Sequence, residues 1–143
     1  MSTTVWIFLL CGVLGIFGEV VFTAILDIFR NRRLRLHGFS FIWMFPIYGL
    51  LAILFPPLSS AVEGFPWPVR GVSYMIGIYL VEFVSGSLLT ALTGSHIWCY
   101  KDRWNFRGQI TLLYAPVWFF IGLMVERYYP WAERVSRALA GIS

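Results

Sequence analysis

Four stretches of the chain are apolar over enough residues to cross a bilayer as helices. They run from about 5–29, 39–58, 71–93 and 108–128, and about 20 apolar residues cover a hydrocarbon core of roughly 30 Å. The segments between them are short and contain most of the charges. The pattern predicts an all-α integral membrane protein with four transmembrane helices, forming a single domain over residues 1–143.

Composition supports this interpretation. Hydrophobic residues make up 59% of the sequence and charged residues only 13%, whereas soluble domains carry about 25% charged residues. The length leaves no room for a separate soluble catalytic module. We therefore expect a multi-pass protein of the cell (cytoplasmic) membrane, with the lipid bilayer as its first partner.

Basic residues predict the orientation of the spans. The two inner loops carry Arg30, Arg32, Arg33, Arg35, Lys101, Arg103 and Arg107. The outer segments carry Arg70, Arg127, Arg134 and Arg137. By the positive-inside rule, this asymmetry places both termini outside. The net charge of +4 is then a signal of topology, not of nucleic-acid binding. Asp27, one turn before the first cluster, is expected to pair with it locally.

The C-terminal segment 130–141 has a different pattern. Trp131, Val135 and Leu139 repeat every fourth residue, and charged side chains fall between them. This amphipathic spacing is typical of a helix that lies on a membrane surface, here the outer one.

Glu19 lies near the middle of the first apolar stretch. A carboxylate at that depth costs about 2.5–3.5 kcal/mol on insertion scales. Gly12, Gly15 and Thr23 lie within two turns on its face of the helix, and they are small enough for a second helix to approach closely. We therefore expect Glu19 to point into a helix bundle. A structural carboxylate bonded to a neighbouring helix and a functional site both remain open.

Glu82 repeats this arrangement near the centre of the third stretch, with Tyr79, Ser85 and Gly86 on the same face. Two carboxylates that face one cleft resist ionising together. Such a pair can carry a proton, bind a cation or hold a cationic or hydroxylated ligand. The aromatic residues expected to line the same cleft are Tyr48, Tyr79, Tyr114 and Trp118.

Prolines suggest an internal repeat. Pro46 and Pro116 fall inside the second and fourth stretches, where each is expected to kink its helix, and Pro56 with Pro57 is expected to end the second. One constant shift aligns Gly38 with Gly108 and Pro46 with Pro116. The chain thus reads as two hairpins of equal orientation, related by a pseudo-two-fold axis along the membrane normal.

The sequence lacks the motifs of several common classes of enzyme. Lys101 is the only lysine and follows no phosphate-binding loop, so this chain contains no ATPase motif. Zinc-protease and Gly-x-Ser-x-Gly motifs are also missing. His96 and Cys99 are too few for a metal site. We expect no catalytic residue, no metal and no cofactor, and we favour a protein that is not an enzyme while leaving that question open.

Several tracts resemble the putative ABC-transporter type IV membrane protein family, which also holds small animal transmembrane proteins of unassigned function. They are 15–24 around Glu19, 46–49, and Glu82 with Gly86. The loop motif and the following span contribute Trp98, Tyr100, Asn105, Gly108, Gln109, Ile110, Leu113, Tyr114 and Trp118. Where the family commonly has an acid between the first two of these, this chain has Cys99, and Asp102 is the nearest substitute. The resemblance implies a four-span membrane fold.

Three functions are compatible with these features. The leading one is transport or binding of a small solute or ion through a central cleft with two midplane carboxylates. The alternative is a non-catalytic subunit or scaffold of a larger membrane complex, and the third is a small lipid-modifying enzyme. A separate ATPase, another membrane subunit and a second copy of the chain stay open as partners.

Overall fold

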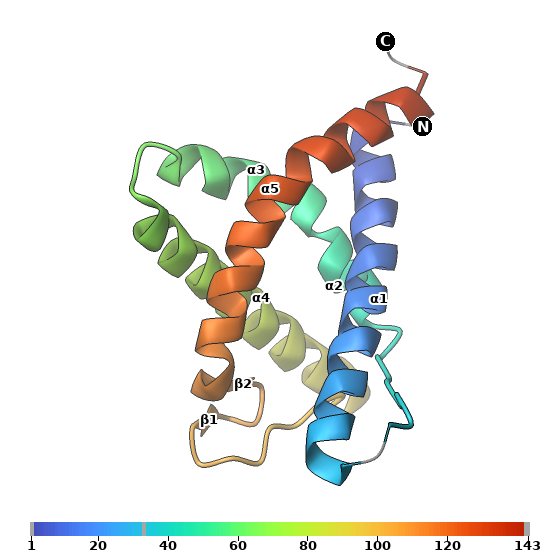
Figure 1. Cartoon of the computed structure of the whole chain (residues 1–143), viewed down its shortest axis with the longest axis vertical. Helices are drawn as coiled ribbons and strands as arrows, with labels where there is room; N and C mark the ends of the chain where they lie inside the picture. Colours follow the sequence, from blue (N-terminus) through green and yellow to red (C-terminus); the bar gives the residue numbers. More distant parts are fainter. Residues whose placement is uncertain (1, 33, 142–143) are drawn as a thin grey trace. The chain divides into compact units, whose positions relative to one another are not determined.

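The computed structural model describes residues 2–32 and 34–141. The chain forms two compact units, Met1–Phe55 with Trp131–Ser143 (unit 1) and Pro56–Pro130 (unit 2), and each is described by itself. The elements in chain order are α1 (Thr3–Asn31), α2 (Met44–Gly49), α3 (Leu51–Val62), α4 (Trp67–Thr93), β1 (Asn105–Phe106), β2 (Ile110–Thr111), the 3-10 helix η1 (Leu112–Tyr114) and α5 (Ala115–Leu139) (Figure 1).

Among the described residues, three helical segments are long and apolar enough to cross a membrane. They are Thr3–Asn31, Met44–Val62 and Trp67–Thr93. This confirms the prediction of an essentially α-helical membrane protein. The third predicted helix, expected over 71–93, is observed as α4 over Trp67–Thr93. Its apolar stretch lies between Pro66 and Gly94, and in lipid the backbone of such a stretch can satisfy its polar groups only through hydrogen bonds within the helix.

The last helix differs from the prediction. The sequence suggested a span over 108–128 followed by a separate surface segment, but α5 begins at Ala115 and runs without a break to Leu139. Residues 105–111 form a β-hairpin instead, with Asn105 opposite Thr111. Charged side chains begin at Glu126, within the helix, which explains why α5 does not match the other three segments in apolar character.

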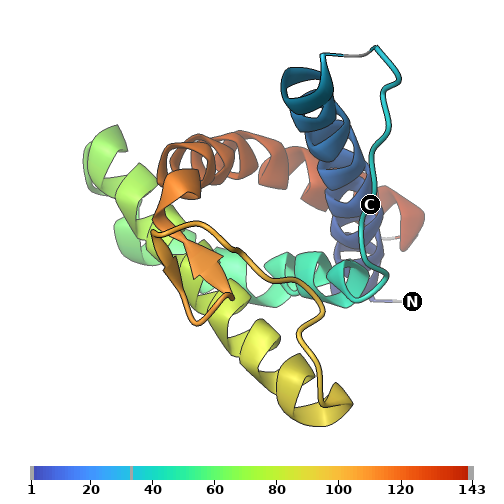
Figure 2. The same ribbon diagram turned by 90° about the horizontal axis from the view of Figure 1, so that it is seen from below.

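In unit 1 the chain leaves α1 and returns along it as an extended segment that leads to α2 (Figures 1 and 2). Gly38 allows the close approach, because a Cβ atom there would collide with the carbonyl oxygen of Val20. Thr23 then fixes the register. Its hydroxyl oxygen accepts a hydrogen bond from the Phe39 amide at 2.9 Å and lies 3.0 Å from the Phe39 carbonyl oxygen.

Glycines also bring α1 and α2 together. A Cβ atom on Gly12 would lie 2.8 Å from the Phe45 ring, and one on Gly15 would overlap the ring of Tyr48. The small face of α1 that the sequence indicated is therefore a packing face, where the lack of a side chain admits an aromatic ring.

Pro46 and Pro116 do not kink helix interiors as expected. Both lie in the first turn, of α2 and of α5 respectively. Amide groups in the first turn have no intrahelical acceptor, so a proline there costs no bond. The Ile42 carbonyl, which a proline in mid-helix would leave without its partner, accepts from the Phe45 amide at 3.1 Å.

The prolines inside helices are others. Pro56 and Pro57 lie within α3, which continues to Val62 where the sequence predicted an end, and Pro130 lies within α5. A proline's fixed φ is compatible with a helix although its amide cannot donate. The two units divide at the Phe55–Pro56 and Pro130–Trp131 peptide bonds, so each helix that connects them contains a proline at the division.

Unit 2 is built on α4 packed against the first half of α5. A Cβ atom on Gly122 would overlap Tyr74, and one on Gly71 would overlap the Phe119 ring. At one end of the pair, Arg70 Nε lies 3.0 Å from Glu126 Oε1 in a largely buried ion pair. Glu126 thus connects the two helices.

Candidate functional site

Glu19 of unit 1 accepts two hydrogen bonds on one carboxylate oxygen. The hydroxyl of Ser40 donates to Oε2 at 2.8 Å, and the hydroxyl of Tyr48 donates to the same atom at 2.9 Å. The donors come from the extended segment and from α2, so three parts of the unit meet at this half-buried side chain. The predicted pair of Glu19 and Tyr48 is therefore in direct contact.

Ser40 was missed by sequence reasoning. It is the one hydroxyl-bearing residue in the run 39–43, which is otherwise aromatic and aliphatic. A lone hydroxyl in such a run is a usable signal, because a polar group near lipid needs a partner. That partner is Glu19. Charge-assisted bonds of this kind are stronger than neutral ones, so the carboxylate has a fixed orientation.

Glu82 of unit 2 is held by a different residue. Its side chain is 9% exposed, and the Tyr100 hydroxyl donates to Oε1 at 2.8 Å. The donor lies in the loop after α4, within the tract that the sequence singled out as a loop motif. The loop motif and the second carboxylate, which were separate predictions, therefore belong to one cluster.

Aromatic rings extend this cluster toward α5. The rings of Tyr100 and Tyr114 meet edge to face with centroids 5.5 Å apart, and those of Tyr114 and Trp118 do so at 5.9 Å. The indole Nε1 of Trp118 is buried and meets no acceptor among the described residues. Two of the four aromatic residues expected near a carboxylate thus lie in series with Glu82.

Tyr79 has another role. Its hydroxyl donates to the Thr111 carbonyl at 2.8 Å, which attaches strand β2 to α4. Tyr79 also lies three residues before Glu82 on α4 and interacts with its charge, so a place for Tyr79 in the lining of the site stays a prediction.

The remaining loop-motif residues shape the hairpin. Trp98 Nε1 donates to the Gln109 carbonyl at 3.0 Å, and Asn105 Oδ1 accepts from the Gly108 amide at 2.9 Å. Gly108 adopts a φ of 71°, in the left-handed region where glycine carries no steric penalty. These bonds give the loop a defined shape that presents Tyr100 to Glu82.

Asp102 belongs to the same framework. Its Oδ1 accepts from the Trp104 amide at 2.9 Å and from the Thr111 hydroxyl at 2.8 Å. Asp102 thus closes the hairpin from the other side. Cys99, which occupies the position of the usual acid, faces Gly108, where a Cβ atom would lie 2.8 Å from its sulfur.

Gln109 and Ser87 are further residues that the sequence did not assign to the site. Gln109 is 5% exposed, and its Oε1 accepts from the Ser87 hydroxyl at 2.7 Å. The Gln109 side chain also packs against Gly86. Within residues 2–32 and 34–141, no three His, Cys, Asp or Glu residues converge in a way that would hold a metal ion.

The sequence matches the family described as Putative ABC-transporter type IV over residues 6–141. The match covers both carboxylates and the loop motif, and it includes α1 from its fourth residue and the whole of α2, α3, α4 and α5. No solved structure matches the chain.

Proposed function

The chain belongs to the putative ABC-transporter type IV family, and from this premise we propose that it binds a small cationic or hydroxylated solute, or an ion, and moves it across the membrane. Glu19 and Glu82 are the proposed ligand-binding carboxylates. Tyr48 is the proposed aromatic residue beside Glu19, and Tyr114 and Trp118 are those of the cluster that contains Glu82, which Tyr100 orients.

One observation carries the proposal. Both hydroxyl donors to Glu19 bond to Oε2, and among the described residues Oε1 receives no hydrogen bond. A carboxylate within a span is costly, and a fixed side chain with one open oxygen is suited to accept from a ligand or to coordinate a cation. A group that only joined helices would gain more stability from using both oxygens.

The proposed topology keeps α5 as a fourth crossing, with both termini outside and the two hairpins related as repeats. Contacts within the units support the repeat. In unit 1 Thr23 of α1 contacts the residue after Gly38, and in unit 2 Gly86 of α4 contacts the residue after Gly108. If transport is driven by ATP, the ATPase is a separate chain.

The test is flux into proteoliposomes that contain the purified protein, with protons, Na⁺, K⁺ and tetramethylammonium as probes. Glu19→Gln and Glu82→Gln keep the size of each side chain and remove its charge. We expect flux of at least one probe in the wild type and a fall in each variant to the rate of protein-free vesicles. Glu63→Gln, which changes an exposed carboxylate in a turn, is the matched control.

A scaffold without transport activity is the second candidate, and the double hydrogen bond to Glu19 favours it because Ser40 and Tyr48 join three segments. Under this function both Gln variants remain folded, because an amide oxygen accepts the same bonds. A wild-type protein that carries none of the probes, or Gln variants with undiminished flux, would support the scaffold and overturn the transport proposal.

A further inference from the structure

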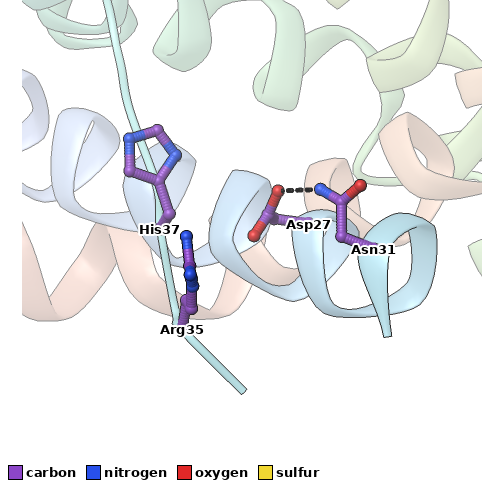
Figure 3. Close-up of a pocket in the computed structure, with 4 residues that line it drawn as sticks. All are labelled: Asp27, Asn31, Arg35 and His37. Atoms are coloured by element: carbon purple, nitrogen blue, oxygen red, sulfur yellow. Dashed lines mark hydrogen bonds between the residues drawn. The ribbon is translucent and has the colours of Figure 1, made fainter. Parts of the chain in front are cut away.

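A second polar site lies at the end of α1, away from both glutamates. Asp27, Asn31, Arg35 and His37 line an open pocket with a volume of about 580 Å³. Figure 3 shows that the first two project from the helix and the last two from the extended segment that follows it. The pocket thus has an acidic wall and a basic wall.

The charges of these two walls do not neutralise each other. Asp27 Oδ1 accepts a hydrogen bond of 2.6 Å from Asn31 Nδ2, and among the described residues no arginine lies within ion-pair distance of Asp27. The expected local pairing of Asp27 with the basic cluster is therefore not seen there, and Arg33 lies outside the described residues. Arg35 and His37 are exposed.

We propose that this pocket binds a zwitterionic ammonium–phosphate group of the phosphoethanolamine type. The ammonium group donates to Asp27, which Asn31 holds in place, and the phosphate accepts from Arg35 and His37. Guanidinium and imidazole groups are good phosphate donors. Arg30 and Arg32 are also exposed close by in the sequence and add positive potential for the phosphate.

The location indicates where such a group comes from. α1 is long and apolar enough to cross a membrane, and its polar end therefore lies near the headgroup layer. Phosphatidylethanolamine presents this zwitterion at that depth, and free phosphoethanolamine presents it from solution. A choline headgroup lacks N–H donors for Asp27, and a glycerol headgroup lacks the cation.

The experiment measures lipid retention on the purified full chain. Protein is equilibrated in detergent micelles with equal amounts of phosphatidylethanolamine, phosphatidylcholine and phosphatidylglycerol of the same acyl chains. Bound lipids are then counted by native mass spectrometry. An exposed ion pair contributes up to about 1 kcal/mol, so we expect phosphatidylethanolamine to be retained about fivefold over phosphatidylcholine.

Two variants separate the two walls. Asp27→Asn still accepts the Asn31 bond but lacks the charge, and it should abolish the preference for phosphatidylethanolamine over phosphatidylcholine. Arg35→Gln should reduce retention of both phosphatidylethanolamine and phosphatidylglycerol. Glu63→Gln is the control for loss of a carboxylate elsewhere. Circular dichroism verifies that each variant is folded, and the exposed position of Arg35 keeps the test available if Asp27→Asn does not fold.

A second arm adds O-phosphoethanolamine as a soluble probe. If it binds and displaces the lipid, the pocket takes the free zwitterion as well. If the lipid preference persists without displacement, the source is the membrane. Equal retention of the three lipids together with no binding of the soluble probe would overturn the proposal, as would an unchanged preference in Asp27→Asn. None of these outcomes depends on Glu19 or Glu82.

Discussion

Tyr100 donates a hydrogen bond of 2.8 Å to Glu82 Oε1, so a loop residue holds a carboxylate that belongs to a transmembrane helix. Nothing in the spacing of the two residues suggested this contact. Because of this hydrogen bond, the shape of the hairpin helps to determine the orientation of Glu82. Residues outside the helices thereby contribute to the proposed binding site.

Tyr100→Phe tests this relationship. The substitution keeps the ring that packs on Tyr114 and removes the hydroxyl. Because a hydrogen bond to a charged group contributes about 1.5–3 kcal/mol, we expect a lower thermal unfolding midpoint in detergent. Tyr79→Phe removes a bond to a backbone carbonyl instead and should cost less, about 0.5–1.5 kcal/mol. Equal midpoints for Tyr100→Phe and the wild type would contradict the assignment.

Gly38→Ala should disrupt the return of the chain along α1. The added methyl group would meet the carbonyl oxygen of Val20, which is backbone and cannot move aside easily. We expect a loss of about 1–3 kcal/mol, typical of overpacking, measured as the unfolding midpoint.

Gly18→Ala, on the helix α1 along which the Gly38 segment runs, is the matched control. Among the described residues, no atom outside the adjoining turns of α1 lies within 4 Å of a Cβ placed at Gly18, and alanine is favoured over glycine in a helix by about 0.5–1 kcal/mol. This variant should be neutral or slightly more stable. Similar losses at Gly18 and Gly38 would argue against the described packing.

Pro130→Ala and Pro116→Ala form another matched pair on α5. Pro130 lies inside the helix, where alanine restores a donor to the Glu126 carbonyl, so we expect stabilisation of up to about 3 kcal/mol. Pro116 lies in the first turn and its replacement should change stability little. The comparison uses thermal unfolding of both variants in one detergent, and a larger effect at Pro116 would be the contrary result.

The proposed orientation makes a prediction about thiol labelling. Cys99 is exposed and Cys11 is buried. A maleimide that cannot cross the membrane should label Cys99 in inside-out vesicles and leave it unlabelled in intact cells. Cys11 should stay unlabelled in both preparations. Labelling of Cys99 in intact cells would reverse the topology.

The sequence predicted the long helices well because their apolar stretches are uniform, as in α4. It predicted proline positions poorly. The hydropathy pattern around Pro46 is equally compatible with a position inside a helix. Its place in the first turn of α2 follows from the turn before it, which is closed by the hydrogen bond from the Phe45 amide to the Ile42 carbonyl. Pro56 and Pro130 show the opposite case, in which an apolar or amphipathic pattern continues through a residue that usually ends a helix.

Some residues of the candidate site could be predicted from the sequence and others could not. Glu19 was predicted because a charge in an apolar run is rare. Tyr48 was predicted with it and lies in α2, the next helix along the chain. Ser40 carried a signal as the one hydroxyl in its apolar run, but its partner, like that of Gln109, lies on a distant segment that one sequence does not identify. The two-residue strands are set by bonds such as that from Thr111 to Asp102, and segments so short carry no periodic signal.

The hydrogen bonding of Thr23 has a consequence for how the chain enters lipid. Backbone that is not helical is tolerated at membrane depth only where protein or water satisfies its polar groups. Thr23 lies about 12 Å along the axis from the end of α1 at Asn31, and its single hydroxyl serves both the amide and the carbonyl of Phe39. One side chain thereby serves a backbone donor and a backbone acceptor in two successive peptide units, which is what an extended segment beside an apolar helix needs if it is to approach the hydrocarbon layer.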